Sequence, residues 1–218
     1  SQGPPESPAS RQVLHRMQTP PRTGLAVSDG RSHARLWGVA AGGVAVDLAS
    51  KSLLWAYLAG PPDAGGRMVD LVPGFLRLVA SRNPGIVFGI NLAEWFSLGP
   101  GAGQVLTAVL TVLTCGLIFY VFAASPRGRR WMHVWCGLIL AGALGNLYDR
   151  LVFGFVRDVF QFTLTVGGKA VWPFVFNAAD VFLVLGVAML ALAILRSPHP
   201  DDAAGAETPS ETHSRDRT

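Results

Sequence analysis

Charged residues are scarce in this chain, and their scarcity argues against an ordinary soluble domain. Only 15% of the 218 residues are Asp, Glu, Lys or Arg, while half are hydrophobic; a soluble domain usually carries about 25% charged residues. Most of the charges lie in the first 35 positions, in a short central run and after Leu195. The segments between them would be solvated by lipid, so the composition predicts a membrane protein.

The chain has only two cysteines, and it lacks the sequence motifs of zinc and serine hydrolases. Cys115 and Cys136 both fall inside apolar segments, and they form no disulfide framework or zinc spacing. No histidine has HExxH spacing and no serine stands in G-x-S-x-G, so zinc proteolysis and serine hydrolysis are not indicated. We expect neither a metal nor a cofactor. The arginines flank apolar spans instead of alternating with aromatics, so the net charge of +4 does not predict nucleic acid binding.

The hydropathy pattern divides the chain into three regions. We expect a disordered basic cytoplasmic tail over residues 1–32, a membrane domain over 33–196 and a disordered cytoplasmic tail over 197–218. Apolar runs long enough to cross a bilayer lie at about residues 36–59, 104–124, 131–148 and 174–195. Residues 60–103 mix β-branched residues with Pro and Gly, which favours short strands at the membrane surface. The predicted fold is an all-α membrane protein with four transmembrane helices and a small β-rich extracytoplasmic platform between helices 1 and 2.

A short basic loop sets the expected orientation. Arg127, Arg129 and Arg130 lie between the second and third spans, and basic loops tend to stay in the cytoplasm. With four spans, both termini are then cytoplasmic. The two longer loops, before the second span and before the fourth, lie outside.

Three carboxylates occur in or beside apolar segments between residues 142 and 180. Asp149, Asp158 and Asp180 would each cost several kcal/mol there unless paired, hydrogen-bonded or facing water. Asn146 and Asp149 share a helical face with two glycines, and Asn177 precedes Asp180 by three residues. Because the third span ends where the fourth begins, these polar faces should meet at the outer surface. Asp180 is expected one and a half to two turns into the fourth span, roughly 10 Å deep.

Two neighbouring carboxylates can share one proton, which is the arrangement of aspartic proteases. Burial should raise the pKa values of such a pair, whereas Arg150 and Arg157 should lower them, and the residues alone do not rank these effects. Asp149 has two interpretations, a helix-end ion pair with Arg150 or a catalytic role in place of Asp158. We interpret Asp47 and Lys51, four residues apart, as a structural intrahelical pair.

Two other functions use the same aspartates. A small non-enzymatic transporter or channel could bind ions or relay protons through them. An intramembrane aspartyl protease of the presenilin type would also need two aspartates, and Tyr148-Asp149 imitates half of its signature. The other half, G-x-G-D, is missing, because Asp180 follows Ala178 and Ala179.

Five blocks of sequence resemble the lipoprotein signal peptidases, or type II signal peptidases. They are DLASK at 47–51, NPGIVFG at 83–89, GNLYDR at 145–150, GFVRD at 154–158 and FNAAD at 176–180, in the family's order and with its four spans. The resemblance implies that Asp158 and Asp180 are the catalytic pair. It implies a substrate-binding or supporting role for six further residues: Asn83, Gly85, Asn146, Asp149, Arg150 and Asn177.

The resemblance also implies an activity and its setting. The family's enzymes are aspartic endopeptidases that remove the signal peptide from lipid-modified prolipoproteins, cleaving before the diacylglyceryl-cysteine. The expected location is the bacterial inner membrane, with the active site near the outer face. Expected partners are prolipoproteins, membrane lipids and globomycin-type inhibitors, and we expect a monomer. Leu48, Ala141 and Arg157 depart from the family pattern, and a cation at Arg157 is expected to lower the pKa of Asp158 and alter the pH optimum.

Overall fold

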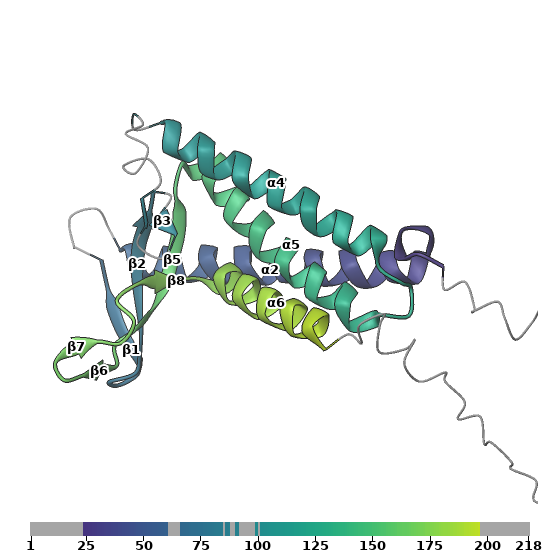
Figure 1. Cartoon of the computed structure of the whole chain (residues 1–218). Coiled ribbons are helices and arrows are strands. Elements are labelled where there is room, and N and C mark those ends of the chain that lie inside the picture. The colour runs from purple at the N-terminus through teal and green to yellow at the C-terminus, as the bar shows by residue number, and fades with distance from the viewer. Residues whose placement is uncertain are drawn as a thin grey trace, which may run out of the picture.

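Four long apolar helices make up most of the structure. The computed structural model describes residues 24–60, 66–84, 86–87, 90–91, 99 and 101–196. Within these residues, four helices are long and apolar enough to cross a membrane: α2 (Gly30–Ala59), α4 (Ala102–Ala124), α5 (Arg130–Phe153) and α6 (Ala178–Leu195). The strands gather at one end of the helices (Figure 1). The expected four-helix membrane architecture is confirmed.

Helix α2 begins earlier than the predicted first span. Asp29 caps its N-terminus by accepting a hydrogen bond from the Ser32 backbone N–H at 2.9 Å. The preceding turn η1 (Ala26–Ser28) is held to the loop after α4, because the Ala26 N–H donates to the Ser125 carbonyl at 2.8 Å. Regular structure therefore starts within the stretch predicted as a disordered tail. The rest of that tail, residues 1–23, and the predicted tail 197–218 lie outside the described residues.

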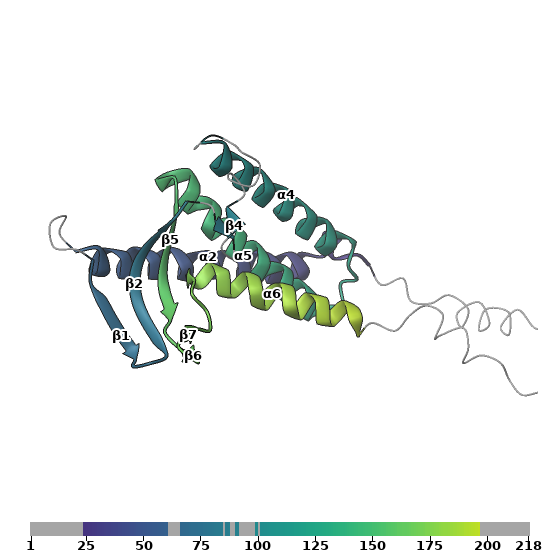
Figure 2. The same ribbon diagram turned by 60° about the vertical axis from the view of Figure 1, so that its left-hand side comes forward.

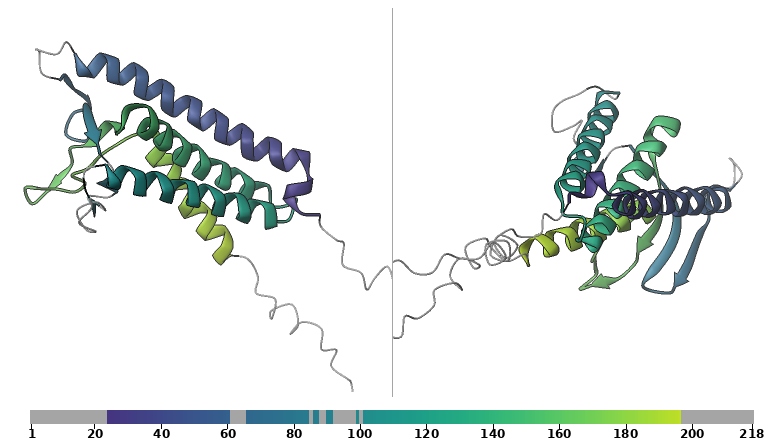
Figure 3. Two further views of the ribbon diagram at one scale, coloured as in Figure 1. Left: turned by 90° about the horizontal axis from the view of Figure 1, so that it is seen from above. Right: turned by 90° about the vertical axis from the view of Figure 1, so that its right-hand side faces the viewer.

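Helix α5 is the centre of the bundle. It contacts α2, α4 and α6. In its most apolar 18-residue stretch 56% of the residues are buried, against 17% in the corresponding stretches of α4 and α6. Seen from above, α2, α5 and α4 run side by side (Figure 3). On another side of α5, a glycine permits close packing with α6, since a Cβ on Gly142 would collide with the Ala179 carbonyl and Leu183 of α6.

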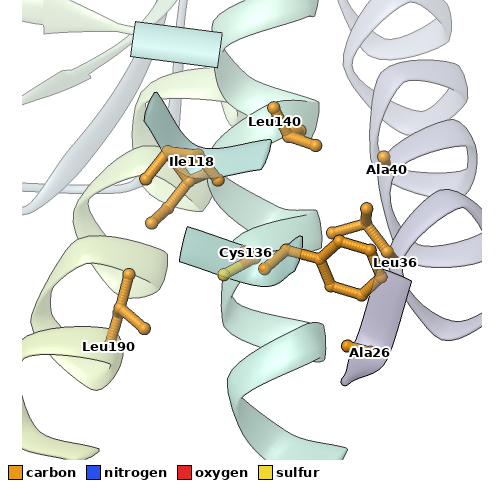
Figure 4. Packing of buried hydrophobic residues seen from close by; sticks show 9 residues of the cluster. Ala26, Leu36, Ala40, Ile118, Cys136, Leu140 and Leu190 are labelled. Carbon is orange, nitrogen blue, oxygen red and sulfur yellow. The ribbon is translucent and has the colours of Figure 1, made fainter. Parts of the chain in front are cut away.

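The larger of two buried apolar clusters in the described part of the chain lies in the half of the bundle away from the sheet, and the smaller joins the end of α2 to the sheet. Figure 4 shows Leu36 and Ala40 of α2, Ile118 of α4, and Cys136 and Leu140 of α5 packed together. Large apolar side chains on the outer faces of the helices, such as Leu53, Leu113 and Leu185, are exposed. In a membrane these outer faces would contact lipid.

The main sheet joins two segments far apart in the sequence. Its strands are antiparallel in the order β1 (Met68–Val72), β2 (Leu76–Asn83), β5 (Val156–Phe162) and β8 (Val175–Phe176). Two short hairpins accompany it, β3 (Ile86–Val87) with β4 (Ile90–Asn91) and β6 (Thr165–Val166) with β7 (Lys169–Ala170). Strands β1, β2 and β5 stand beside one another at the end of the helices (Figure 2).

The sheet corrects one part of the predicted fold. The sequence places the strands between the first two spans, but β5 and β8 come from the segment between α5 and α6. Strand β5 is the inner strand that pairs with both β2 and β8. The segment after α5 is therefore built into the same sheet as the segment after α2, which brings their polar residues together.

Candidate active site

Strand β5 follows helix α5 almost without a linker, and a glycine makes this possible. Gly154 caps the C-terminus of α5 in the left-handed conformation, with φ of 76°, where a side chain would be strained. Its N–H donates to the Arg150 carbonyl at 3.1 Å, and its own carbonyl accepts a hydrogen bond from Gln104 Nε2 of α4 at 2.5 Å. The chain thus turns sharply from α5 into β5, and Asp158 is carried back over the end of α5.

Helix α6 begins inside the site. Asn177 is its N-cap, accepting from the Asp180 N–H at 3.1 Å, and the Asp180 carboxylate accepts from the Asn177 N–H at 3.0 Å. This reciprocal capping box fixes the first residue of the helix at Ala178. Asp180 therefore lies in the first turn of α6 and not one and a half to two turns into a longer span, because α6 starts at Ala178 and not at residue 174.

Three amide side chains donate hydrogen bonds around the two aspartates, and two of them connect the pair. Asn177 Nδ2 donates to Asp158 Oδ1 at 2.6 Å and contacts Asn146 Oδ1 at 3.1 Å. Asn146 Nδ2 in turn donates to Asp180 Oδ1 at 2.8 Å. On the other side, Asn83 Nδ2 of strand β2 donates to Asp158 Oδ2 at 3.0 Å. Asp158 and Asp180 thus belong to one hydrogen-bonded network at the meeting point of α5, β5 and α6.

The pKa of Asp158 is raised from its ordinary value of 3.8 to about 7. Burial is the main cause, since only 2% of the residue is exposed, and the charge of Asp180 adds to it. The hydrogen bonds from Asn83 and Asn177 and the charge of Lys51 act in the opposite direction and are outweighed. Burial therefore dominates at this carboxyl group.

Arg157 does not act on Asp158 as the sequence suggested. Neighbouring residues of a strand point to opposite faces of the sheet, and the Arg157 guanidinium pairs with Asp149, its Nη2 lying 2.8 Å from Asp149 Oδ1. The pKa of Asp158 is raised and not lowered, with burial as the main cause. The expected lowering of that pKa by Arg157 is therefore wrong.

Four buried charges form a second cluster beneath the aspartates. Lys51 Nζ lies 2.8 Å from Asp47 Oδ2, so the predicted pair within α2 is present, and both side chains are fully buried. Lys51 also lies 3.5 Å from Asp149 Oδ2 and donates to Asn146 Oδ1 at 2.9 Å. The ion partners of Asp149 are thus Arg157 and Lys51, in place of the neighbouring Arg150 that the sequence suggested.

A second glycine lets this cluster form. A Cβ on Gly145 would collide with the Asp47 carboxylate. The other oxygen of that carboxylate accepts a hydrogen bond from the Ala179 N–H at 2.9 Å. Asp47 therefore bridges α2, α5 and the first turn of α6, which goes beyond the pair with Lys51 expected from its spacing.

Two predicted site residues complete the set. Arg150 is half-buried at the end of α5, near enough for the charges of Asp180 and Asp158 to act on it, and its buried Nε has no hydrogen-bond partner among the described residues. Gly85 lies outside the described residues. Sequence reasoning missed the contact of Lys51 with Asn146, which joins two helices 95 residues apart, and that of Arg157 with Asp149, which joins a strand to a helix across a sharp turn. No spacing rule predicts either contact.

Metal ligands do not gather in the described part of the chain. No group of three or more His, Cys, Asp or Glu side chains there could hold a metal ion. The polar groups around Asp158 and Asp180 are amide nitrogens, which donate hydrogen bonds to carboxylates. This arrangement can hold two acidic groups in place with a water molecule as the third reactant.

Comparison with known proteins is consistent with this geometry. The family model described as Signal peptidase (SPase) II matches residues 39–196. A lipoprotein signal peptidase of Desulfitobacterium hafniense is 38% identical over 130 residues, covering 60% of this chain and 76% of that protein. One of Chlorobaculum parvum is 38% identical over 127 residues, covering 56% and 73%.

A solved structure shares the fold. It is described as a bacterial membrane enzyme structure obtained by the in meso method at 2.3 Å resolution. The TM-score is 0.57 at 26% sequence identity, and the match covers 84% of this chain and 95% of the other.

Proposed function

The chain belongs to the signal peptidase II family, and from that premise we propose that Asp158 and Asp180 are a catalytic pair that activates water. The protein is a multi-pass bacterial membrane protease that removes signal peptides from prolipoproteins. We further propose that its substrates are lipid-modified and that it cleaves before the diacylglyceryl-cysteine. The observation that carries the mechanism is the amide network that links the two carboxylates.

The pKa of Asp158 supports an assignment of the proton. With its pKa raised to about 7, a large fraction of Asp158 holds a proton at neutral pH, which suits it to act as the proton donor of the pair. Asp180 then takes a proton from the attacking water, and Asp158 donates its proton to the oxygen of the scissile carbonyl. The C–N bond of the tetrahedral intermediate breaks when Asp180 passes the proton taken from water to the leaving nitrogen. Asp158 takes back a proton from one hydroxyl of the intermediate, so both carboxyl groups return to their starting states. Neither a metal nor a covalent intermediate is required.

Two residues are suited to hold the peptide. The charges of Asp180 and Asp158 act on Arg150, and its half-buried guanidinium has donors that suit a substrate carbonyl. Asn83 stands at the end of β2, hydrogen-bonded to Asp158, where an extended substrate would pass. Gly85 follows two residues later, and we carry it as a substrate-contacting position from the family resemblance. Asn146, Asp149 and Asn177 support the pair, whereas Asp47 and Lys51 hold the helices together.

The position of the site supports an orientation. The sheet lies at the end of the bundle opposite the loop that carries Arg127 and Arg129 (Figure 1). If that basic loop is cytoplasmic, both chain ends are cytoplasmic and the sheet is an extracytoplasmic platform. A substrate anchored by diacylglycerol would present its scissile bond at the same depth as the aspartates. We propose this arrangement for a monomer that contacts membrane lipids and binds globomycin-type inhibitors.

A two-substrate assay tests this function. Purified protein is incubated with a synthetic lipid-modified precursor peptide and with its unmodified counterpart, and the products are separated by gel mobility. We expect cleavage of the modified form only, and a loss of at least about 100-fold in Asp158→Asn and in Asp180→Asn, because each removes one proton-transfer group.

Matched controls make the result decisive. Asp70→Asn removes an exposed carboxylate of strand β1 that pairs with Arg77, away from the site, and should retain wild-type activity. Full turnover in Asp158→Asn or Asp180→Asn would remove the pair from the mechanism. Ion flux through reconstituted wild-type protein, with no cleavage of either peptide, would instead favour a transporter.

A further inference from the structure

Arg157 is a buried cation on strand β5, and the proposed mechanism does not use it. Only 6% of the residue is exposed, and it directly precedes Asp158 in β5. We propose that Arg157 is a positioning residue for the reaction. It neutralises Asp149, so that Lys51 keeps its hydrogen bond to Asn146 and Asn146 keeps its hydrogen bond to Asp180. This inference rests on the proposed function, because it assigns the orientation of one of the two catalytic groups to a residue that touches neither.

The contact between Arg157 and Asp149 satisfies both carboxylate oxygens. Nε and Nη2 of Arg157 lie 3.2 and 2.8 Å from Asp149 Oδ1, and the Arg157 backbone N–H donates to Oδ2 at 2.9 Å. The guanidinium also lies 4.3 Å from the centre of the Phe153 ring. A planar fork held on one side by a ring and on the other by a carboxylate has little freedom. The end of α5 and strand β5 are thereby locked together.

This lock decides where Lys51 makes its close contacts. Lys51 Nζ is 2.8 Å from Asp47 Oδ2 and 2.9 Å from Asn146 Oδ1, but 3.5 Å from Asp149 Oδ2. Because Arg157 already neutralises Asp149, the attraction between that carboxylate and Lys51 is weaker than it would be for an unpaired buried carboxylate. Without Arg157, Asp149 would be a buried carboxylate with Lys51 as the cation already in contact with it, and the lysine would be drawn away from Asn146.

The orientation of the Asn146 amide links these buried charges to Asp180. Its Oδ1 accepts from Lys51 Nζ at 2.9 Å and from Asn177 Nδ2 at 3.1 Å. With two donors on the oxygen, the amide nitrogen must point the other way, where it donates to Asp180 Oδ1 at 2.8 Å. Loss of the lysine contact would leave the amide free to turn, and Asp180 would lose a donor that holds it in place.

The same sheet offers a matched arginine. Arg82 of β2 is directly opposite Arg157 in the register and also lies over a phenylalanine ring, with its guanidinium 5.0 Å from the centre of Phe155. Unlike Arg157, it is exposed. Arg82→Val therefore removes a cation and a ring contact from the same place in the sheet without touching the buried charges.

The test compares Arg157→Val, Asp149→Asn, the double variant and Arg82→Val in the lipopeptide assay, with thermal unfolding in detergent alongside. We expect kcat of Arg157→Val to fall about tenfold or more with KM within about twofold, because the loss affects the reaction and not peptide binding. The double variant removes both buried charges, so its kcat should exceed that of Arg157→Val by about fivefold or more. Arg82→Val should match the wild type.

The other outcomes also decide for or against the inference. An unchanged kcat in Arg157→Val, or a double variant no faster than Arg157→Val, would show that charge balance at Asp149 does not act on the site. If Arg157→Val does not fold, a folded and active double variant supports the inference and a folded but inactive one overturns it. Failure of both to fold would make Arg157 purely structural. Wild-type cleavage in the same assay tests the proposed function separately.

Discussion

At the scale of single residues, neighbours in sequence have opposite environments. Asp158 and Arg157 are adjacent in β5, yet the acid faces Asn83 and Asn177 while the cation faces Asp149. Successive side chains of a β-strand point to opposite faces of the sheet, so the two charged groups have different partners. Asp158 is therefore buried without an ion pair to Arg157, and its high pKa follows from that placement.

The pH dependence of cleavage tests this environment. At a pH below its pKa of about 7, Asp158 keeps the proton that it would donate to the carbonyl oxygen; at a higher pH it loses this proton, and the proposed donor is lost. We expect kcat/KM to fall about tenfold per pH unit once the pH is well above 7. The measurement is the initial rate on the lipopeptide between pH 5 and 9. A rate that rises from pH 7 to pH 9 would contradict the assignment of the proton to Asp158.

At the scale of elements, glycines set the distance between helices and allow the turn into strand β5. Gly142 and Gly145 stand on one face of α5, where a Cβ would collide with α6 or with Asp47. Gly154 ends α5 in a conformation that favours glycine and sends the chain into β5. The network between the aspartates needs α2, α5 and α6 at these short separations, so packing and chemistry depend on the same residues.

Gly145→Ala tests the close approach of α5 to Asp47. The added methyl would have to displace a buried carboxylate, so we expect a loss of about 1–3 kcal/mol in the free energy of unfolding, together with reduced cleavage. The matched control is Gly116→Ala on α4, where a Cβ meets nothing within 4 Å. Unfolding by denaturant in detergent measures both variants. Equal stability of the two would show that the approach at Gly145 is not needed.

At the scale of the whole molecule, the polar site and the larger apolar cluster occupy opposite halves of the bundle. The cluster around Leu36 and Cys136 lies towards η1 and the basic loop, whereas the aspartates lie at the sheet. Large apolar side chains cover the outer faces of the helices between them. Such a division fits a membrane protein whose reaction takes place at one surface of the bilayer.

Labelling of introduced cysteines tests which surface that is. Thr165→Cys lies in the exposed hairpin of the sheet, and Gly128→Cys lies exposed in the basic loop. In spheroplasts we expect a membrane-impermeant maleimide to label Thr165→Cys at once and Gly128→Cys only after lysis, because the positive loop stays inside. The wild type is the control, since Cys115 and Cys136 lie within α4 and α5. The reverse pattern would invert the proposed topology.

Much of this protein is determined by its sequence alone. Four runs of about 20 apolar residues suffice to predict four helices, because the bilayer sets the length of a span. The order of the blocks around Asp47, Asn83, Asn146, Asp158 and Asp180 indicates the family. The cost of burying carboxylates points to the segment where a site should be. Each of these conclusions rests on local pattern, composition or block order.

Only the tertiary structure decides which side chains meet. Lys51 reaches Asn146 across 95 positions of sequence, Asp158 lies against Asn83 through the β2–β5 pairing, and Arg157 turns to Asp149 instead of its neighbour. Local pattern specifies the face of a helix or strand, but the partner on that face depends on how closely the elements pack. Here glycines on α5 and the turn at Gly154 set that closeness, and the charge balance of the site follows from it.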